Sequence, residues 1–387
     1  MKILFVSHSS ELFGAERSML EAVAALNEKG LVVEVAVPSE GELATKLRSL
    51  GITVHQIPYT WWVASPEWRG TYYHLRRKLQ NLIAGPKFNR LLREHRPDVV
   101  VTNTLTIPSG ALAARRAKIP HVWCVHEFAG TDPDTTNTDP QQHSGNFYFD
   151  LGRRRSFALM DKLSARVIAN SKAVALSLSE HVPAEKLRVL YYVVEVAPTT
   201  LPPKQKTEQL VLICVGRLET NKRQEDAIRA LASLKIKGLQ LRLVLIGPDV
   251  LSYEKKLREL ASSLGVIENV EFAGSVPDAQ PYFAAADIAL VCARNEAFGR
   301  VTIEAMKAGK PVIGADHGGT SELISDGLNG LKFAAGDSED LARKIEILYH
   351  DENMRREMGE RAQDWALTNF NREKFGRDLL QILEEAV

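Results

Sequence analysis

Residues 287–315 read DIALVCARNEAFGRVTIEAMKAGKPVIGA, and this stretch decides the fold class. Its two ends, 287–293 and 310–315, are short apolar runs typical of buried strands. The residues between them predict a helix that extends to about Lys307 and is closed by Gly309. Two buried strands joined by one helix indicate a parallel sheet that is covered by helices on both faces.

The same alternation of strands and helices extends through the rest of the chain. Nearer the middle, apolar strands are predicted at 209–216, 241–247 and 269–274. The first half predicts six more strands, at residues 2–8, 31–38, 52–58, 98–103, 120–126 and 166–170. We therefore predict an α/β protein of two doubly wound, Rossmann-like domains, whose ligands bind beyond the carboxyl ends of the strands. The predicted active site is the cleft where the two domains face each other.

The boundary between the domains is predicted at residues 196–208, VAPTTLPPKQKTE, where three prolines and few apolar residues interrupt the alternation. The N-terminal domain then covers 1–195 and the C-terminal domain covers 209–371. Residues 372–387 predict a last helix with an apolar stripe that needs a partner. This helix could pack back on the N-terminal domain.

Composition excludes several classes of protein. With 387 residues, 45% of them hydrophobic and 25% charged, the chain suits a globular protein with more than one core. Its 49 basic and 48 acidic residues nearly cancel, which argues against a surface built for nucleic acid. No stretch approaches the ~20 apolar residues of a membrane helix, and the N-terminus lacks a signal-peptide pattern. We expect a cytoplasmic protein whose three cysteines are buried thiols.

Two glutamates in the opening stretch suggest a ligand. Glu296 lies at the strand-to-helix turn, and Glu304 lies eight residues further on, inside the helix. The first free N–H groups of that helix favour an anion, whereas carboxylates suit the hydroxyls of a sugar or a ribose. The alternative is a capped surface helix that carries two ordinary glutamates.

These residues resemble the Glu-x7-Glu signature of glycosyltransferase family 4, whose members are retaining, nucleotide-sugar-dependent enzymes of the GT-B fold. The resemblance continues past the signature through EAMKAGKPVIGADHGGTSELISDGLNGL, residues 304–331. Further matching segments are GRLETNK (216–222), LVLIGPD (243–249), residues 270–290, FGAERSM (13–19), VHEF (125–128) and Ser171 in VIANS. The resemblance therefore spans nearly the whole chain.

In the C-terminal domain the resemblance implies a donor site. Arg217 and Lys222 match the cations that hold the donor diphosphate, and such cations stabilise a leaving group that gains negative charge. Glu296 matches the residue that binds the donor sugar, and Glu304 matches the one that binds the ribose. The other implied substrate contacts are Gly216, Gly247, Val276, Phe298, Gly299, Arg300 and Val301.

In the N-terminal domain the resemblance implies three further site residues. Gly14 would let the backbone approach the donor phosphate, because glycine lacks a Cβ; alternatively it is only a turn before the helix at 15–28. His126 matches the histidine near the transferred sugar and completes a catalytic set with Arg217, Lys222 and Glu296, although a lone histidine is more often structural. Ser171 matches a strand-end serine and is expected to contact substrate.

The chain also departs from the family pattern. Phe13 stands where the family has the first of two glycines, Arg223 replaces a glycine, and residues 189–195 replace a usual Asn-Gly turn. The sequence contains neither a Cys-x-x-Cys nor a His-Glu-x-x-His metal-binding motif. Asp132 and Asp134 form an Asp-x-Asp pattern, but they lie in a polar run that predicts a loop. We expect neither a metal nor a cofactor besides the donor.

The N-terminal domain also contains a basic, aromatic segment at 61–96. It contains the aromatic residues Trp61, Trp62, Trp68, Tyr72 and Tyr73, and residues 69–116 carry ten basic residues against Glu94 and Asp98. One helical face is shared by Leu75, Leu79, Leu82 and Ile83, and Gly85-Pro86 is expected to break or kink the helix. The segment could contact an anionic membrane or a lipid-diphosphate acceptor, or it could be an amphipathic helix whose aromatics are core. Nucleic acid is disfavoured by the balanced charge.

The sequence thus predicts a metal-independent, retaining glycosyltransferase. It would move a sugar from a UDP- or GDP-linked donor to a hydroxyl of a glycan or lipid-linked acceptor, as in polysaccharide or glycolipid synthesis. It would work in the cytoplasm, or peripherally at the inner face of the membrane. The alternatives are a nucleotide-sugar epimerase of the same fold and a catalytically silent nucleotide-sugar-binding or scaffold protein.

Overall fold

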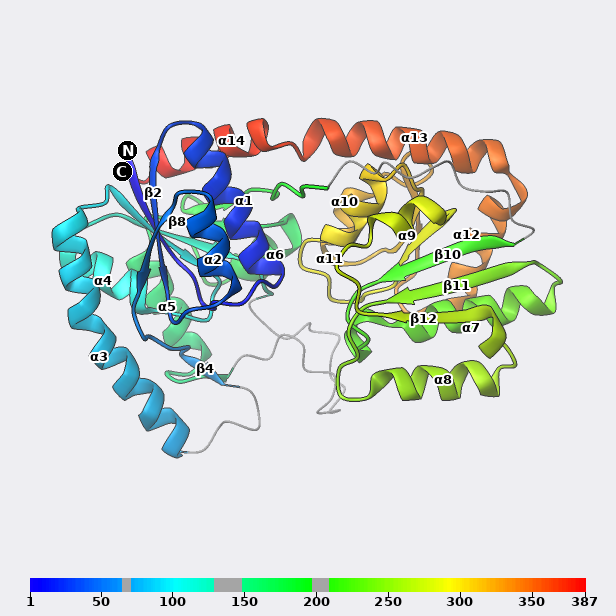
Figure 1. The fold of residues 1–387 in the computed structure, drawn as a ribbon, viewed down its shortest axis with the longest axis horizontal. Coiled ribbons are helices and arrows are strands. Elements are labelled where there is room, and N and C mark those ends of the chain that lie inside the picture. Colours follow the sequence, from blue (N-terminus) through cyan, green and yellow to red (C-terminus); the bar gives the residue numbers. More distant parts are fainter. Residues whose placement is uncertain (65–70, 129–147, 197–208) are drawn as a thin grey trace. The chain divides into compact units, whose positions relative to one another are not determined.

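The computed structural model describes residues 1–64, 71–128, 148–196 and 209–387. Contacts divide the chain into two compact units (Figure 1). The first holds the described residues of Met1–Thr136, Gly145–Val193 and Asn371–Val387, and the second those of Val194–Phe370. Trp68, Asp132, Asp134 and the linker residues 197–208 lie outside the described residues.

The first unit is built on a seven-stranded parallel sheet. Its strands are β1 (Lys2–Val6), β2 (Val32–Val37), β3 (Thr53–Gln56), β5 (Val99–Asn103), β6 (His121–Val125), β8 (Arg166–Ala169) and β9 (Leu187–Val189). They lie in the order β3-β2-β1-β5-β6-β8-β9, so the winding direction reverses between β1 and β5. Two short strands, β4 (Val63–Ala64) and β7 (Tyr148–Phe149), pair antiparallel beside it.

Seven helices belong to the described part of this unit. They are α1 (Gly14–Glu28), α2 (Glu42–Ser49), α3 (Thr71–His95), α4 (Ser109–Ala117), α5 (Arg153–Leu163), α6 (Lys172–Leu178) and α14 (Arg372–Glu384). The C-terminal α14 packs on α1, where a Cβ on Gly376 would lie 3.2 Å from the Cβ of Ala25. Of the predicted break or kink at Gly85-Pro86, the break is wrong, because α3 runs continuously through Pro86. Ala84 and Phe88 are buried on either side of that proline, so core packing holds both halves of the helix.

The second unit contains a six-stranded parallel sheet. Its strands are β10 (Leu210–Val215), β11 (Leu241–Ile246), β12 (Val270–Gly274), β13 (Ile288–Val291), β14 (Val312–Ala315) and β15 (Gly330–Phe333), in the order β12-β11-β10-β13-β14-β15. Its α-helices are α7 (Gln224–Ile236), α8 (Tyr253–Ser263), α9 (Gln280–Ala285), α10 (Arg300–Lys307), α11 (Gly318–Leu323), α12 (Ser338–His350) and α13 (Glu352–Asn369), with short 3₁₀ helices η3 (Thr220–Lys222) and η4 (Ile267–Asn269).

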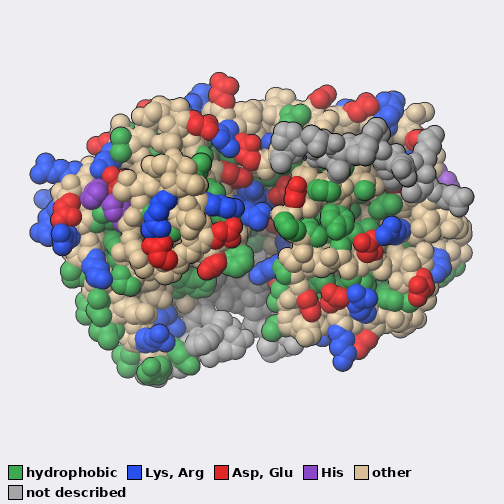
Figure 2. All heavy atoms as spheres, in the orientation of Figure 1, with side chains coloured by type: hydrophobic (Ala, Val, Ile, Leu, Met, Phe, Trp, Pro, Cys, Tyr) green, Lys and Arg blue, Asp and Glu red, His purple; other side chains and the backbone are tan. Residues whose placement is uncertain are grey.

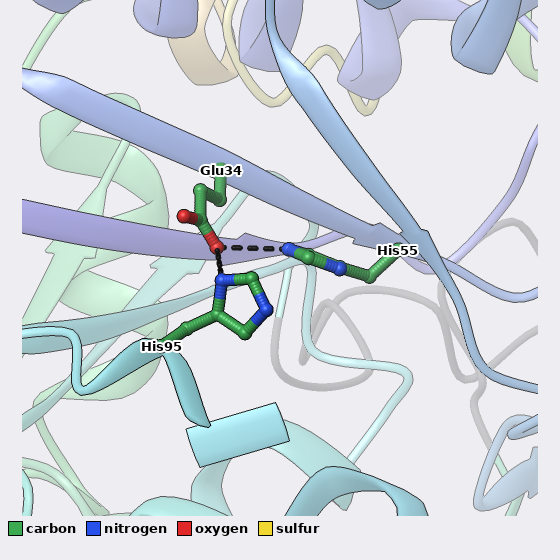
Figure 3. Close-up of side chains that lie close together, drawn as sticks. All are labelled: Glu34, His55 and His95. Carbon is green, nitrogen blue, oxygen red and sulfur yellow. Dashed lines mark hydrogen bonds and ion pairs between the residues drawn. The ribbon is translucent and has the colours of Figure 1, made fainter. Parts of the chain in front are cut away.

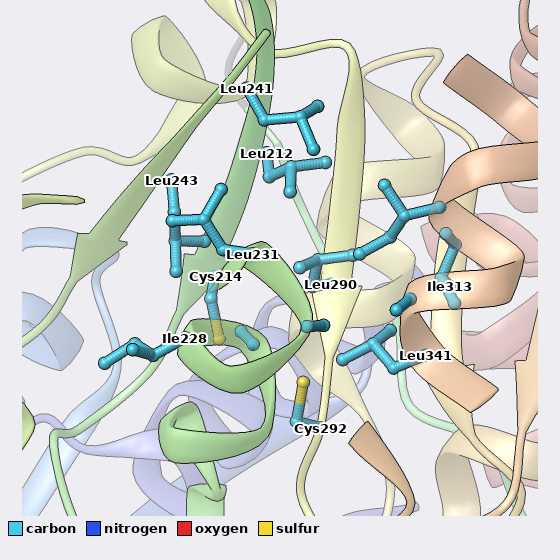
Figure 4. Packing of buried hydrophobic residues seen from close by; sticks show 14 of the residues in the cluster. Leu212, Cys214, Ile228, Leu231, Leu241, Leu243, Leu290, Cys292, Ile313 and Leu341 are labelled. Atoms are coloured by element: carbon cyan, nitrogen blue, oxygen red, sulfur yellow. The ribbon is translucent and has the colours of Figure 1, made fainter. Parts of the chain in front are cut away.

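Apolar strand residues fill the core of the second unit. Leu212, Leu243 and Leu290 point from neighbouring strands toward Leu231 of α7 and Leu341 of α12 (Figure 4). All three cysteines are buried and none forms a disulfide, as predicted. The prediction of two Rossmann-like parallel sheets is confirmed. None of the helices that the structure describes is both long and apolar enough to cross a bilayer.

Candidate functional site

The second sheet has its switch point between β10 and β13. The chain builds outward from β10 to β11 and β12 and then returns to place β13 on the other side of β10. In doubly wound sheets, ligands bind beyond the carboxyl ends of the strands at such a point, because the loops there diverge. Lys222 comes from η3 after β10, and Glu296 comes from the loop after β13.

Lys222 and Glu296 form an ion pair at this switch point. The Lys222 Nζ donates to Glu296 Oε2 over 2.6 Å, and the two side chains are 24% and 21% exposed. Burial alone would lower the pKa of Lys222, but the charge and hydrogen bond of Glu296 outweigh it and raise that pKa. Lys222 is therefore a cation over the whole physiological range. Arg217 does not join this pair in the structure, because its 60% exposed guanidinium binds Glu219.

Two predicted glycines stand where the strand ends crowd together. A Cβ on Gly247 would lie 2.0 Å from the carbonyl oxygen of Gly216, and Gly247 has a φ of +145°. Gly216 also has a positive φ, and its Cβ position faces the Lys222 side chain at 3.7 Å. Both glycines therefore have a structural role besides any contact with a ligand. Val276 follows β12 and is half-buried.

The helix α10 begins directly after the loop that carries Glu296. Gly299 precedes its first residue with a φ of +94°, followed by the half-buried Arg300 and Val301. Phe298 is 5% exposed and anchors the loop, whereas Glu304 is half-buried in the helix.

The loop after β13 is also held by α11. The Gly319 N–H donates to the Glu296 carbonyl over 2.7 Å. A Cβ on Gly319 would lie 2.6 Å from the backbone oxygens of the two residues after Glu296. Beside this clamp, the hydroxyls of Thr302 and Thr320 are buried and find no hydrogen-bond partner among the described residues. The α10 N-terminus with two unused hydroxyls is a place where an anion can bind.

In the first unit, the end of β6 places His126 beside the end of β5. His126 Nε2 lies 2.7 Å from Asn103 Oδ1, so Nε2 carries the hydrogen and donates it, because an amide oxygen only accepts. The Asn103 Nδ2 in turn donates to the Ala15 carbonyl in the first turn of α1. The Tyr192 ring lies 4.9 Å from the His126 ring between centroids. These contacts fix the ring of His126.

The structure adds three residues that the sequence prediction missed. Glu127 is half-buried and accepts hydrogen bonds from the backbone N–H groups of His126 and Leu105, at 3.1 and 3.4 Å. Burial raises the pKa of Glu127 to about 7, opposed by those hydrogen bonds and assisted by the charge of Glu16.

Glu16 and His8 complete this acidic region. Glu16 is 1% exposed, and its Oε1 lies 3.0 Å from His8 Nε2. Burial raises the pKa of Glu16 and lowers that of His8 to about 4, so His8 is neutral. A sequence signal for Glu16 existed: with Met19, Val23 and Leu26 it occupies the buried face of α1, where an unpaired acid is costly.

The two remaining predicted residues differ in how well the fold explains them. Ser171 is fully buried, and its hydroxyl caps α6 by accepting from Val174 N over 3.0 Å. That cap accounts for Ser171 without a ligand. Gly14 begins α1, and a Cβ there would meet nothing within 4 Å. Packing within the protein therefore gives no reason for a glycine at position 14.

Both halves of the chain match described families. Residues 13–192 match the Glycosyl transferase 4-like domain, and residues 200–365 match Glycosyl transferases group 1. The lipopolysaccharide core biosynthesis glycosyltransferase LpsE of Rhizobium meliloti is 33% identical over 173 residues, 45% of this chain and 49% of that protein. A D-inositol 3-phosphate glycosyltransferase of Corynebacterium kroppenstedtii is 33% identical over 184 residues, 46% of this chain and 41% of that protein. The chain thus matches about half the length of these curated relatives.

The fold is similar to solved structures over its whole length. Anabaena Alr3699/HepE in complex with UDP-glucose has a TM-score of 0.77 and 25% identity, with 99% of each chain covered. Its complex with UDP has a TM-score of 0.79 and 24% identity, with 99% of this chain and 100% of that chain covered.

Proposed function

We propose that this chain moves a sugar from a nucleoside diphosphate to an acceptor hydroxyl. The chain belongs to the glycosyltransferase family that both of its halves match. The reaction would retain the configuration of the sugar and need no metal ion. The donor would bind the second unit, and the acceptor would bind the first.

The Lys222–Glu296 pair carries this proposal. When a donor binds, its diphosphate takes the place of Glu296 as the partner of Lys222. As the bond to the sugar breaks, the diphosphate gains negative charge, so a fixed cation stabilises the transition state more than the ground state. The α10 N-terminus adds N–H donors, and Arg217 can leave Glu219 because its side chain is 60% exposed.

The released Glu296 carboxylate would accept hydrogen bonds from the sugar hydroxyls, and Glu304 from the ribose. Retention follows if the acceptor attacks from the side of the leaving diphosphate, whose oxygen then takes the acceptor proton. His126, held by Asn103, would bind a hydroxyl close to the reacting carbon. Gly14, where a Cβ would stand in open space, would let a phosphate approach the backbone of the first unit.

The relatives favour particular substrates. UDP-glucose is bound by the Anabaena protein, which favours a UDP-linked donor over a GDP-linked one. A lipopolysaccharide core enzyme among the relatives favours a glycan or lipid-linked acceptor.

The proposal is tested with purified protein, a panel of nucleoside diphosphates and their sugars, and chelator present. One nucleotide should raise the melting temperature without metal, since ligand at one hundred times its Kd stabilises by about 2.7 kcal/mol. Acceptor-dependent release of that nucleotide should fall about 10²- to 10³-fold in Lys222→Ala. The control Lys237→Ala removes a lysine from an exposed ion pair with Glu346 and should keep full activity. Full turnover in Lys222→Ala overturns the diphosphate assignment.

Two other outcomes identify the rival functions. A changed sugar released without acceptor would identify an epimerase. Absence of any nucleotide shift would favour a silent scaffold.

We further propose that α3 rests on an anionic membrane and brings a lipid-linked acceptor to the first unit. Tyr72, Leu75, Leu79 and Leu82 repeat at three and four residues along α3 and are 58–72% exposed. These leucines are not core, although the neighbouring Trp62 is buried at 3%. Figure 2 shows hydrophobic side chains with lysines and arginines among them over α3. Apolar side chains flanked by cations suit the interface of anionic lipids.

Vesicle sedimentation tests this surface. The protein should bind phosphatidylglycerol vesicles and not phosphatidylcholine vesicles, and salt should weaken binding. Leu79→Gln with Leu82→Gln should abolish binding without changing the melting temperature. The control Ile236→Gln changes an 89% exposed residue of the second unit and should bind normally. Equal binding by both variants contradicts the assignment.

A further inference from the structure

A histidine–carboxylate cluster lies in the first unit, apart from the site described above. Glu34 projects from β2, His55 from β3, and His95 is the last residue of α3 (Figure 3). His55 Nε2 and His95 Nδ1 each lie 2.8 Å from the same carboxylate oxygen, Glu34 Oε2. The ligand-type atoms of all three residues lie within 4.8 Å of one another.

The fold brings these residues together from segments far apart in sequence. Glu34 pairs in register with Thr53, so His55, two residues later, projects from the same face of the sheet. Leu4, which also pairs with Glu34, packs in one cluster with Phe88 and Leu92 of α3. The face that bears Glu34 is therefore the face that α3 covers, and the end of α3 delivers His95.

The carboxylate at the centre of the cluster is ionised and fixed. Its side chain is 8% exposed, and Lys2 Nζ binds the other oxygen, Oε1, over 2.7 Å. Burial raises the pKa of Glu34, but the hydrogen bonds from Lys2, His55 and His95 prevail and hold the pKa below its ordinary value. Oε2 thus carries negative charge and faces two imidazoles, which are themselves 16% and 31% exposed.

We propose that Glu34, His55 and His95 bind a divalent transition-metal ion, Zn²⁺ in the first instance. Two imidazole nitrogens and one carboxylate oxygen are a common zinc ligand set, with bonds of about 2.0–2.1 Å. A tetrahedral ion with such bonds separates its ligands by about 3.3 Å. Each imidazole therefore needs to move about 0.5 Å from its present hydrogen bond, and water completes the coordination. Lys2 stays on Oε1 and holds the carboxylate in a one-oxygen mode.

The ion would serve as a clip in the fold. It would link β2, β3 and the end of α3, whereas His126 and Glu127 follow β6, which β1 and β5 separate from β2. The proposal is therefore independent of sugar transfer, and a metal-independent reaction remains compatible with it.

Isothermal titration of Zn²⁺ into the metal-stripped chain at neutral pH tests the proposal. We expect one ion per chain and a rise in melting temperature. His55→Ala and His95→Ala should each weaken binding about tenfold or more and cancel the rise. Co²⁺ should give the visible absorption bands of a four-coordinate ion, which an ion-pair cluster alone cannot produce.

The matched control is His74→Ala. His74 also pairs with a carboxylate, that of Asp150 at 3.0 Å, but has no second histidine there in the described chain. This variant should bind zinc like the unaltered protein. Absence of zinc binding, or binding that survives both His55→Ala and His95→Ala in correctly folded protein, overturns the proposal and leaves a cluster of ion pairs.

Discussion

Glu127→Gln should change how the stability of the first unit depends on pH. The folded protein raises the pKa of Glu127 to about 7 from an ordinary 4.5, because burial disfavours its charge. A raised pKa means that the folded state holds the proton more tightly than the unfolded chain. The stability from that proton is therefore complete below about pH 4.5 and is lost as the pH rises through about 7.

The size of this loss follows from the two pKa values. Between pH 5 and pH 8, linkage gives a loss of about 2.5 kcal/mol of unfolding free energy from Glu127 alone. The glutamine side chain of the variant keeps an acceptor oxygen for the two backbone N–H groups that bind Glu127 now, but it cannot ionise. Between pH 5 and pH 8, the free energy of unfolding of the variant should therefore rise by about 2.5 kcal/mol relative to that of the unaltered protein.

Urea unfolding followed by tryptophan fluorescence measures the effect. Trp61, Trp62 and Trp123 belong to the first unit, so the signal reports mainly on its unfolding. The difference in unfolding free energy between the variant and the unaltered protein, taken at each pH, cancels the contributions of the other titrating groups. The control Glu185→Gln makes the same exchange at an exposed position of the same unit. A pH-independent difference for Glu127→Gln would refute the reasoning, since Glu127 would then be charged in the folded state.

Three further variants test the candidate site. Glu296→Gln removes the charge that holds Lys222, so calorimetry should show free nucleoside diphosphate binding about threefold to tenfold more tightly, while sugar transfer falls. Weaker binding would contradict the idea that the diphosphate replaces Glu296 as the partner of Lys222. Gly14→Ala puts a Cβ in open space, so the free energy of unfolding should stay within about 0.5 kcal/mol of that of the unaltered protein, while the KM for the donor rises. An unchanged KM would mean that Gly14 only forms a turn before the helix. In Gly247→Ala the new Cβ would clash with the Gly216 carbonyl oxygen, and the φ of +145° is strained for alanine. The free energy of unfolding of the second unit should therefore fall by about 3 kcal/mol or more. An unchanged melting curve would show that the strand ends can separate.

Most of the sheets could be predicted from the sequence because their strands are buried on both faces. β1, β5 and β10 each contain an apolar run, at residues 3–6, 99–101 and 210–215, and their positions match the predicted ranges within a few residues. β9 and β15 were not predicted: β9 has an edge position and no fully buried residue, and β15 interrupts its apolar residues with Lys332. Local pattern carries little information about such edge strands.

Helix patterns were harder to interpret, because a periodic apolar face does not say what covers it. Leu75, Leu79 and Leu82 of α3 show the same spacing as the buried face of α1, yet they are exposed. Likewise, Pro86 suggested a break that packing on either side of it prevents. In both cases tertiary contacts decided the outcome.

The two units also differ in how far their candidate sites can be recognised, and the difference follows from connectivity. In the second unit Lys222 ends the short helix η3 and Glu296 lies in the loop before α10, and each segment has its own glycine and helix start, so each is a motif by itself. In the first unit His8, Glu16, Asn103 and Glu127 come from four separate strand or helix ends. No spacing relates them, and only the order β1-β5-β6 brings them together. A phosphate needs one constant set of cations and N–H groups, which suits a contiguous loop. If the acceptor binds there, as we propose, a site gathered from several strand ends can change one residue at a time, and substrate choice should be sought there by mutation.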